Sequence, residues 1–260
     1  MNRQNQRGFT VIEVVLFLAV SGLLGIGILA TASSSVNQER YRDSVRSLQA
    51  YVQDQYSKVL NTQNDRAGNR YACTASGTIV DTSVSGGGAT QSRGASDCYI
   101  VGRVVDVLDA DRKTLVSQPV YATYDPMQDA LLPTSDSQAF DRSRLIIAPS
   151  SVSAEEVGRS ESTLEWDTAI VSESGGPRMF RLLIVRSPYS GMIRTYAEVA
   201  ENLPATSTAS VRALAVGNRQ TDVTLCVDPA GLFTGQDLGV QIARGATSSA
   251  GVTLLDGGAC

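Results

Sequence analysis

The chain has 260 residues, a formal net charge of −4, four cysteines and no histidine. This acidic balance does not favour nucleic acid as a partner through bulk electrostatics. The lack of histidine excludes a Ser-His-Asp triad, a Cys-His pair and a histidine-based zinc site. No residue pattern supports catalysis or a bound cofactor, so the sequence predicts a protein that is not an enzyme.

An apolar run from 9 to 32 is the first feature along the chain. As a helix it would be about 36 Å long, which exceeds the bilayer hydrocarbon core of about 30 Å. Arg3 and Arg7 precede the run without an acidic residue, so the N-terminus is expected in the cytoplasm and the rest of the chain outside. Glu13 is the single charged residue between Arg7 and Glu39. A carboxylate within such a run indicates a functional role.

A short motif opens this run. Gly8 is followed by Phe9, by Glu13 four residues later, and then by the remaining apolar residues. The arrangement resembles the class III signal of type IV pilins and pseudopilins, the subunits of type IV pili (fimbriae) and related filaments. The resemblance implies that a prepilin peptidase cleaves after Gly8. Residues 1–8 would then be a leader peptide, and Phe9 would become the mature N-terminus, which is usually methylated in this family.

The same resemblance implies a role for Glu13 in filament assembly. In this family the corresponding carboxylate neutralises the N-terminal amine of a neighbouring subunit, here the amine of Phe9, as apolar helices bundle into a filament core. The amine is a cation at neutral pH, and a buried charge without a partner is costly. The implied partners are other pilins or pseudopilins, the prepilin peptidase, the pilus assembly machinery and the cytoplasmic membrane. That membrane would hold the single-pass subunit before it enters an extracellular or periplasmic filament.

Three alternatives stay open for this N-terminal segment. The residues Ala30-Thr31-Ala32 before Ser33 resemble the cleavage site of an ordinary secretory signal peptide. The run could instead be a plain single-span anchor that tolerates Glu13. In a third alternative the helix only tethers a surface binding module, such as an adhesin or a DNA receptor.

Beyond the apolar run the pattern becomes amphipathic. Apolar residues recur at spacings of three and four, which is typical of one helix face: Val45, Leu48, Val52, Tyr56 and Val59. The first proline of the chain is Pro119, so one helix is predicted from Phe9 to about Leu60, within a segment 9–61. Its half at 9–32 would span the membrane or lie in the filament core, and its second half would carry the head. Gly22, Gly25 and Gly27 would make the spanning half easy to bend.

Residues 62–260 are expected to form one β-rich head domain, which at about 200 residues is large enough for its own core. Tyr99–Leu108 and Leu115–Tyr124 are predicted strands joined by a turn at Asp109–Lys113. Further predicted strands are Arg144–Ala148, Thr163–Val171, Arg178–Ser187, Met192–Val199, Asp222–Val227, Gly239–Ala243 and Gly251–Leu255, with helical turns at Ser153–Arg159 and Ala209–Ala215. The predicted fold class is α+β, with the long helix packed on an antiparallel β-sheet or β-sandwich. The size of the head favours a minor pilin over a bulk subunit.

An acidic cluster lies near the first predicted turn. Asp106, Asp109 and Asp111 could bind calcium, but the pattern lacks the glycine and the distal glutamate of an EF-hand loop. A solvated hairpin turn is the favoured interpretation, and no metal site is predicted.

The four cysteines are expected to form two disulfides, Cys73–Cys98 and Cys226–Cys260. An even number of cysteines in an exported protein favours bridging, and each of these pairs closes a local loop. The second pair also resembles the C-terminal disulfide-bounded region of many pilins. Sequence alone leaves the other two pairings open, as well as free buried cysteines.

We predict that the mature protein begins at Phe9, with an N-methyl group, and not at Ser33. Glycine at position 8 suits a peptidase that must bring its catalytic groups close to the scissile backbone. Mass spectrometry of the protein isolated from its native membrane measures this terminus. A mature chain that begins at Ser33 would contradict a filament subunit, because the apolar run and Glu13 would both be lost.

Overall fold

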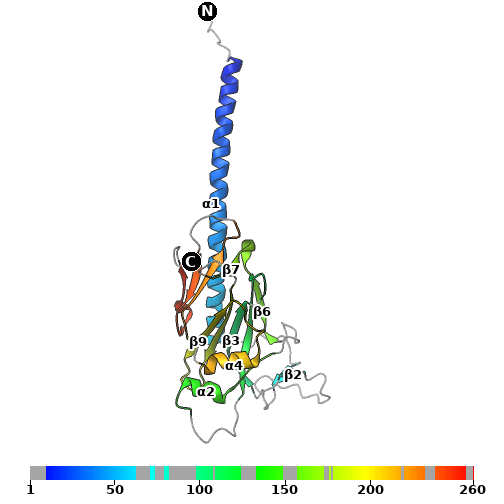
Figure 1. Ribbon diagram of the computed structural model, residues 1–260, viewed down its shortest axis with the longest axis vertical. Helices are drawn as coiled ribbons and strands as arrows, with labels where there is room; N and C mark the ends of the chain where they lie inside the picture. The colour runs from blue at the N-terminus through cyan, green and yellow to red at the C-terminus, as the bar shows by residue number, and fades with distance from the viewer. Residues whose placement is uncertain are drawn as a thin grey trace, which may run out of the picture.

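One long helix and an antiparallel β head make up the protein (Figure 1). The computed structural model describes residues 10–62, 71–73, 79–81, 98–107, 109–123, 133–148, 157–172, 176, 178–217, 220–231, 238–255 and 260. Helix α1 (Val11–Leu60) runs without a break for 50 residues. Its first half projects from the head, and its second half lies within the head from Tyr41 onward.

The larger sheet of the head has six strands among the described residues. Its order is β5-β4-β3-β8-β9, and β6 pairs with the other end of β4. All of these pairings are antiparallel. The strands are β3 (Cys98–Val107), β4 (Thr114–Thr123), β5 (Arg144–Ile147), β6 (Ser160–Thr163), β8 (Met179–Arg186) and β9 (Ile193–Ala200).

A smaller antiparallel sheet lies beside α1 as well. Within the described part of the chain it has four strands in the order β12-β11-β10-β7. They are β7 (Ala169–Val171), β10 (Val223–Asp228), β11 (Leu238–Ile242) and β12 (Val252–Leu255). The remaining elements are the paired strands β1 (Tyr71–Cys73) and β2 (Ile79–Asp81), the helices α2 (Asp136–Arg142) and α4 (Thr208–Val216), and the 3-10 helices η2 (Glu165–Asp167) and η3 (Ser249–Gly251).

The six-stranded sheet separates two apolar clusters. Successive strand residues point to opposite faces, so Val105 belongs to the cluster beneath α1 while its neighbour Val104 belongs to the cluster on the other side. The first cluster joins the second half of α1 to both sheets. The second cluster joins the larger sheet to α2 and α4, through residues such as Phe140 and Leu214. The head is therefore layered, with α1 held between its two sheets.

The predicted fold class is confirmed, and so is the helical face of α1: its five stripe residues are all buried. The predicted strand Thr163–Val171 is wrong as a single element. It is divided by η2 into β6 of the larger sheet and β7 of the smaller one. Helix α2 was not predicted, and most of Ser153–Arg159 lies outside the described residues.

Position 102 on β3 is occupied by glycine because the backbone of the neighbouring strand β8 lies very close to it. An added Cβ at this position would lie 2.1 Å from the Ile184 carbonyl oxygen and 2.7 Å from the Val185 Cα atom. Both neighbours belong to β8. The pairing of β3 with β4 also shifts by one residue between Ile100 and Gly102.

We expect Gly102→Ala to destabilise the head by about 1–3 kcal/mol or more, because two central strands would have to separate. Urea unfolding of the detergent-solubilised full chain, with its disulfides intact, measures the change. Gly22→Ala is the control, since nothing lies within 4 Å of an added Cβ there. Equal midpoints for Gly102→Ala and the unchanged protein would contradict this account of the β3–β8 contact.

Candidate membrane and assembly helix

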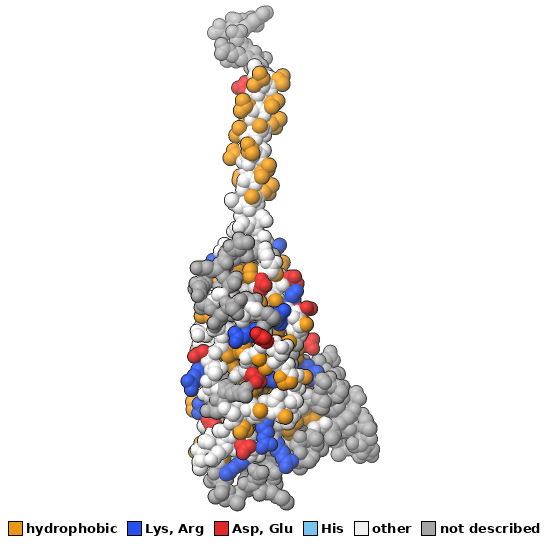
Figure 2. Space-filling view, viewed as in Figure 1, with side chains coloured by type: hydrophobic (Ala, Val, Ile, Leu, Met, Phe, Trp, Pro, Cys, Tyr) orange, Lys and Arg blue, Asp and Glu red, His pale blue; other side chains and the backbone are white. Residues whose placement is uncertain are grey.

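The first half of α1 makes almost no contact with the head. Its large apolar side chains are 46% to 80% exposed between Val11 and Val36, and the helix is long and apolar enough to cross a membrane. Figure 2 shows hydrophobic side chains along this projecting half, whereas charged side chains gather on the head. An exposed apolar surface of this size marks a segment that lies in a membrane or against a partner, so this half of α1 is a candidate membrane anchor.

Glu13 lies in the first turn of this apolar half. Thr10 is the N-cap residue, and its hydroxyl oxygen accepts a hydrogen bond of 3.4 Å from the Glu13 backbone N–H. A carboxylate in a first turn is favourable because it faces the positive end of the helix dipole. Within the described residues, the Glu13 carboxylate has no cationic partner. The processing residues Gly8 and Phe9 lie outside the described residues.

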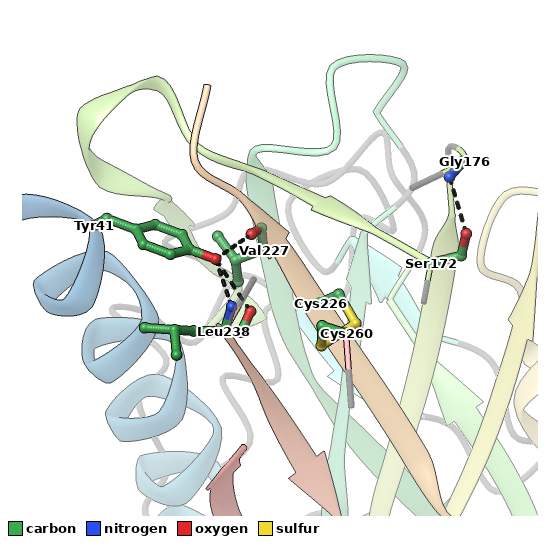
Figure 3. The surroundings of a disulfide bond; sticks show 7 residues. All are labelled: Tyr41, Ser172, Gly176, Cys226, Val227, Leu238 and Cys260. Atoms are coloured by element: carbon green, nitrogen blue, oxygen red, sulfur yellow. Dashed lines mark hydrogen bonds between the residues drawn. A yellow bond between two sulfur atoms is a disulfide. The ribbon is translucent and has the colours of Figure 1, made fainter. Parts of the chain in front are cut away.

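Tyr41 marks the level at which α1 enters the head. Its hydroxyl group donates a hydrogen bond of 2.7 Å to the Val227 carbonyl oxygen and accepts one of 2.7 Å from the Leu238 backbone N–H. Figure 3 shows the ring pointing from α1 toward these two residues. One fully buried side chain thus binds α1 to the ends of β10 and β11.

Further along α1, buried polar side chains reach three other elements. The Ser44 hydroxyl lies 2.6 Å from the Thr168 hydroxyl, just after η2. The Gln55 side-chain oxygen accepts a hydrogen bond of 2.7 Å from Ser117 on β4. The Tyr56 hydroxyl lies 2.9 Å from that of Thr195 on β9. These contacts satisfy polar groups that would otherwise be costly to bury.

The Tyr56 hydroxyl stays neutral throughout the physiological pH range. Burial raises its pKa to about 12, and the hydrogen bond with Thr195 opposes this only in part. Thr195 in turn donates to the Ala246 carbonyl oxygen at 2.6 Å. This hydrogen-bonded chain therefore does not depend on pH near neutrality.

The sequence alone pointed to Glu13 but not to these polar contacts of α1. Tyr41 continues the apolar stripe one turn before Val45, so the spacing could have located it. The partners Val227, Leu238 and Thr195 are 139 to 197 positions away in the sequence. No local pattern identifies such distant partners.

A disulfide also holds β10, the strand whose Val227 accepts the Tyr41 hydrogen bond. Cys226 on β10 is bonded to Cys260, with their Cα atoms 5.6 Å apart (Figure 3), as expected. Gly239 on β11 pairs with Cys226. A Cβ added at Gly239 would lie 2.7 Å from the Cys260 sulfur. Cys98 is also disulfide-bonded. The side chain of its expected partner Cys73 lies outside the described residues, so that pairing stays a prediction.

The acidic cluster does not form a solvated turn as a whole. Asp106 is buried in β3, where its carboxylate accepts hydrogen bonds from the Arg181 Nε atom at 2.7 Å and the Thr206 hydroxyl at 2.6 Å. Asp109 does belong to the turn, and its carboxylate accepts from the backbone N–H groups of Lys113 and Thr114. Among the described residues no group of acidic, cysteine or histidine side chains could hold a metal ion.

No protein-family model, curated protein or solved structure matches the chain significantly. A long N-terminal apolar helix attached to an antiparallel β head is compatible with a pilin-like architecture.

We expect Tyr41→Phe to destabilise the head by about 1–3 kcal/mol, because the partly buried Leu238 N–H and the buried Val227 carbonyl would each lose a partner. Urea unfolding measures the free-energy change, and hydrogen exchange should show faster exchange at the Leu238 amide. Tyr189→Phe is the control, since Tyr189 is 52% exposed and its change should stay within about 0.5 kcal/mol. Unchanged Leu238 exchange in Tyr41→Phe would show that the hydroxyl does not hold β11.

Proposed function

We propose that this chain is a type IV pilin-like filament subunit, either a minor pilin or a pseudopilin. A prepilin peptidase cleaves it after Gly8. The subunit then waits in the cytoplasmic membrane with α1 as its single span and its head outside. The assembly machinery extracts it into a filament by moving α1 from lipid into a bundle of equivalent helices.

The observation that carries this proposal is the exposed apolar half of α1 with one carboxylate in its first turn. A helix that serves only as a tether gains nothing from Glu13, whereas a charge carried into an apolar helix bundle without a partner is costly. The motif Gly8-Phe9 directly ahead of it supplies a reason for the carboxylate. Cleavage between these residues creates a new amine at Phe9, four residues before Glu13 in the sequence.

The pairing proposed here is between subunits. The Phe9 amine of one subunit lies beside the Glu13 carboxylate of a neighbour that is displaced along the filament axis. Inside a helix bundle each charge alone would be strongly unfavourable, whereas the pair is compensated. The contact would thus set the axial step between subunits, because apolar helices alone can slide past one another.

The position of Glu13 also allows a purely structural role, which an experiment can separate from pairing. Thr10-Val11-Ile12-Glu13 has the spacing of a capping box, in which a glutamine at the last position performs as well as a glutamate. Glutamine keeps the size and hydrogen-bonding capacity of the side chain but removes the charge. A capping role is retained in Glu13→Gln, whereas a pairing role is lost.

We predict that Glu13→Ala and Glu13→Gln both reach the membrane with a folded head but fail to enter filaments. Their incorporation should fall at least about tenfold, as expected when an ion pair worth more than about 1.4 kcal/mol is lost. Immunoblots of sheared filaments and of membranes measure the two pools. Normal incorporation of Glu13→Gln with loss for Glu13→Ala would indicate capping instead of pairing. Normal incorporation of both would refute an assembly role for Glu13.

A further inference from the structure

An aromatic residue lies beside the place where α1 leaves the head. Trp166 of η2 is the single tryptophan of the chain and is 43% exposed. The Arg40 guanidinium stacks over its ring, 4.6 Å from the ring centroid. These two residues line a hollow at the base of the projecting helix together with Ser35, Val36, Glu39, Asp43 and Arg46. We call Arg40, Trp166 and this hollow the neck collar.

The backbone of η2 at Trp166 is strained, and contacts of the following residues stabilise it. Trp166 and Asp167 both have positive φ angles, 59° and 63°, a conformation that is unfavourable for residues other than glycine. Asp167 pairs with Lys113, and the next residue, Thr168, is held by Ser44 of α1. The exposed ring is thus fixed in place by its neighbours. The exposure of Trp166 therefore follows from a fixed backbone turn.

The length of the projecting helix sets the depth of the neck collar. From Val11 to Arg40 the helix rises about 45 Å, at 1.5 Å per residue. A bilayer with its headgroup regions is about 40–45 Å thick. With the start of α1 at the inner headgroup layer, Arg40 and Trp166 would therefore lie at the outer one. Tryptophan is enriched at this boundary because its ring is apolar and its N–H is polar.

We propose that the neck collar docks on the phospholipid headgroup layer at the outer face of the membrane. This inference rests on the proposed membrane insertion of α1 and goes beyond it. Docking orients the head while the subunit is in the membrane, because it adds a second contact to the single helix. The Arg40 guanidinium would bind a lipid phosphate group while the Trp166 ring stacked against it lies at the same level, next to the upper ends of the acyl chains.

The charges near the neck collar give it no preference for an anionic lipid surface. Among the described residues, α1 from 39 to 46 and η2 with its partner Lys113 carry four basic and four acidic side chains, so net charge supplies no attraction. They are Arg40, Arg42, Arg46 and Lys113 with Glu39, Asp43, Glu165 and Asp167. The binding is therefore expected to depend on the Trp166 ring and to change little with salt.

Because Trp166 is the single tryptophan, its fluorescence reports on the neck collar alone. The experiment uses the full mature chain in phosphatidylcholine vesicles, with bromine atoms placed either near the headgroup end or near the terminal methyl of the acyl chains. We expect a blue-shifted emission and about twofold quenching by the shallow bromines, with little effect of the deep ones. Carbonate extraction of the same vesicles measures insertion of α1.

A matched control places the tryptophan at the other end of the head. Tyr189 follows Ser187, whose hydroxyl binds Asp136 at the start of α2, far from the projecting helix (Figure 1). The double variant Trp166→Phe/Tyr189→Trp should insert equally well but show no quenching by bromine.

Three other outcomes would overturn the inference, and they separate a failure of docking from a failure of membrane insertion. Resistance to carbonate with an unquenched Trp166 would refute docking while leaving membrane insertion intact. Complete extraction by carbonate would refute both the docking and the proposed insertion. A Trp166 emission that changes only after assembly into filaments would assign the neck collar to a neighbouring subunit.

Discussion

The hydrogen bonds of the Tyr41 hydroxyl lie where α1 passes from an exposed apolar helix to a buried one. Before this residue the helix buries no large apolar side chain, and after it a continuous stripe is covered by both sheets. One continuous helix therefore has an exposed half and a buried half. Because the first half makes almost no contact with the head, the contacts of the second half alone attach α1 to it.

Apolar packing alone would hold α1 without fixing its position, since similar apolar side chains repeat along the stripe. The buried polar side chains remove this freedom. Ser44, Gln55 and Tyr56 each bind a different element of the head. A shift of one helical turn, about 5.4 Å, would leave all three side chains without hydrogen-bond partners. Each buried polar group left unsatisfied would destabilise the head by about 1–3 kcal/mol. We infer that the polar contacts set the register and the apolar stripe supplies most of the stabilisation.

Local periodicity was sufficient to predict α1, its buried stripe and most of the strands, because those patterns follow directly from burial on one face. Pairing across the sheet was not accessible in the same way. Asp106 looked like part of an acidic turn because Asp109 and Asp111 follow it, but its partner Arg181 is 75 positions away on β8. The break at η2 was missed because Trp166 and Ile170 suit a strand, and only the contacts of Asp167 and Thr168 stabilise the left-handed turn. Glu13 was found because a charge in an apolar run needs no structure to be noticed.

Strand β10 connects the helix to the covalent framework of the head. Val227 accepts the Tyr41 hydrogen bond on this strand, and its neighbour Cys226 carries the bond to Cys260. Neighbouring strand residues face opposite ways, so β10 is held by α1 on one face and by the disulfide on the other. Gly239 leaves room for the sulfur of Cys260 on that second face. A pull along α1 would thus reach a strand that is braced on both sides, which is what the proposed extraction from a membrane requires of the head.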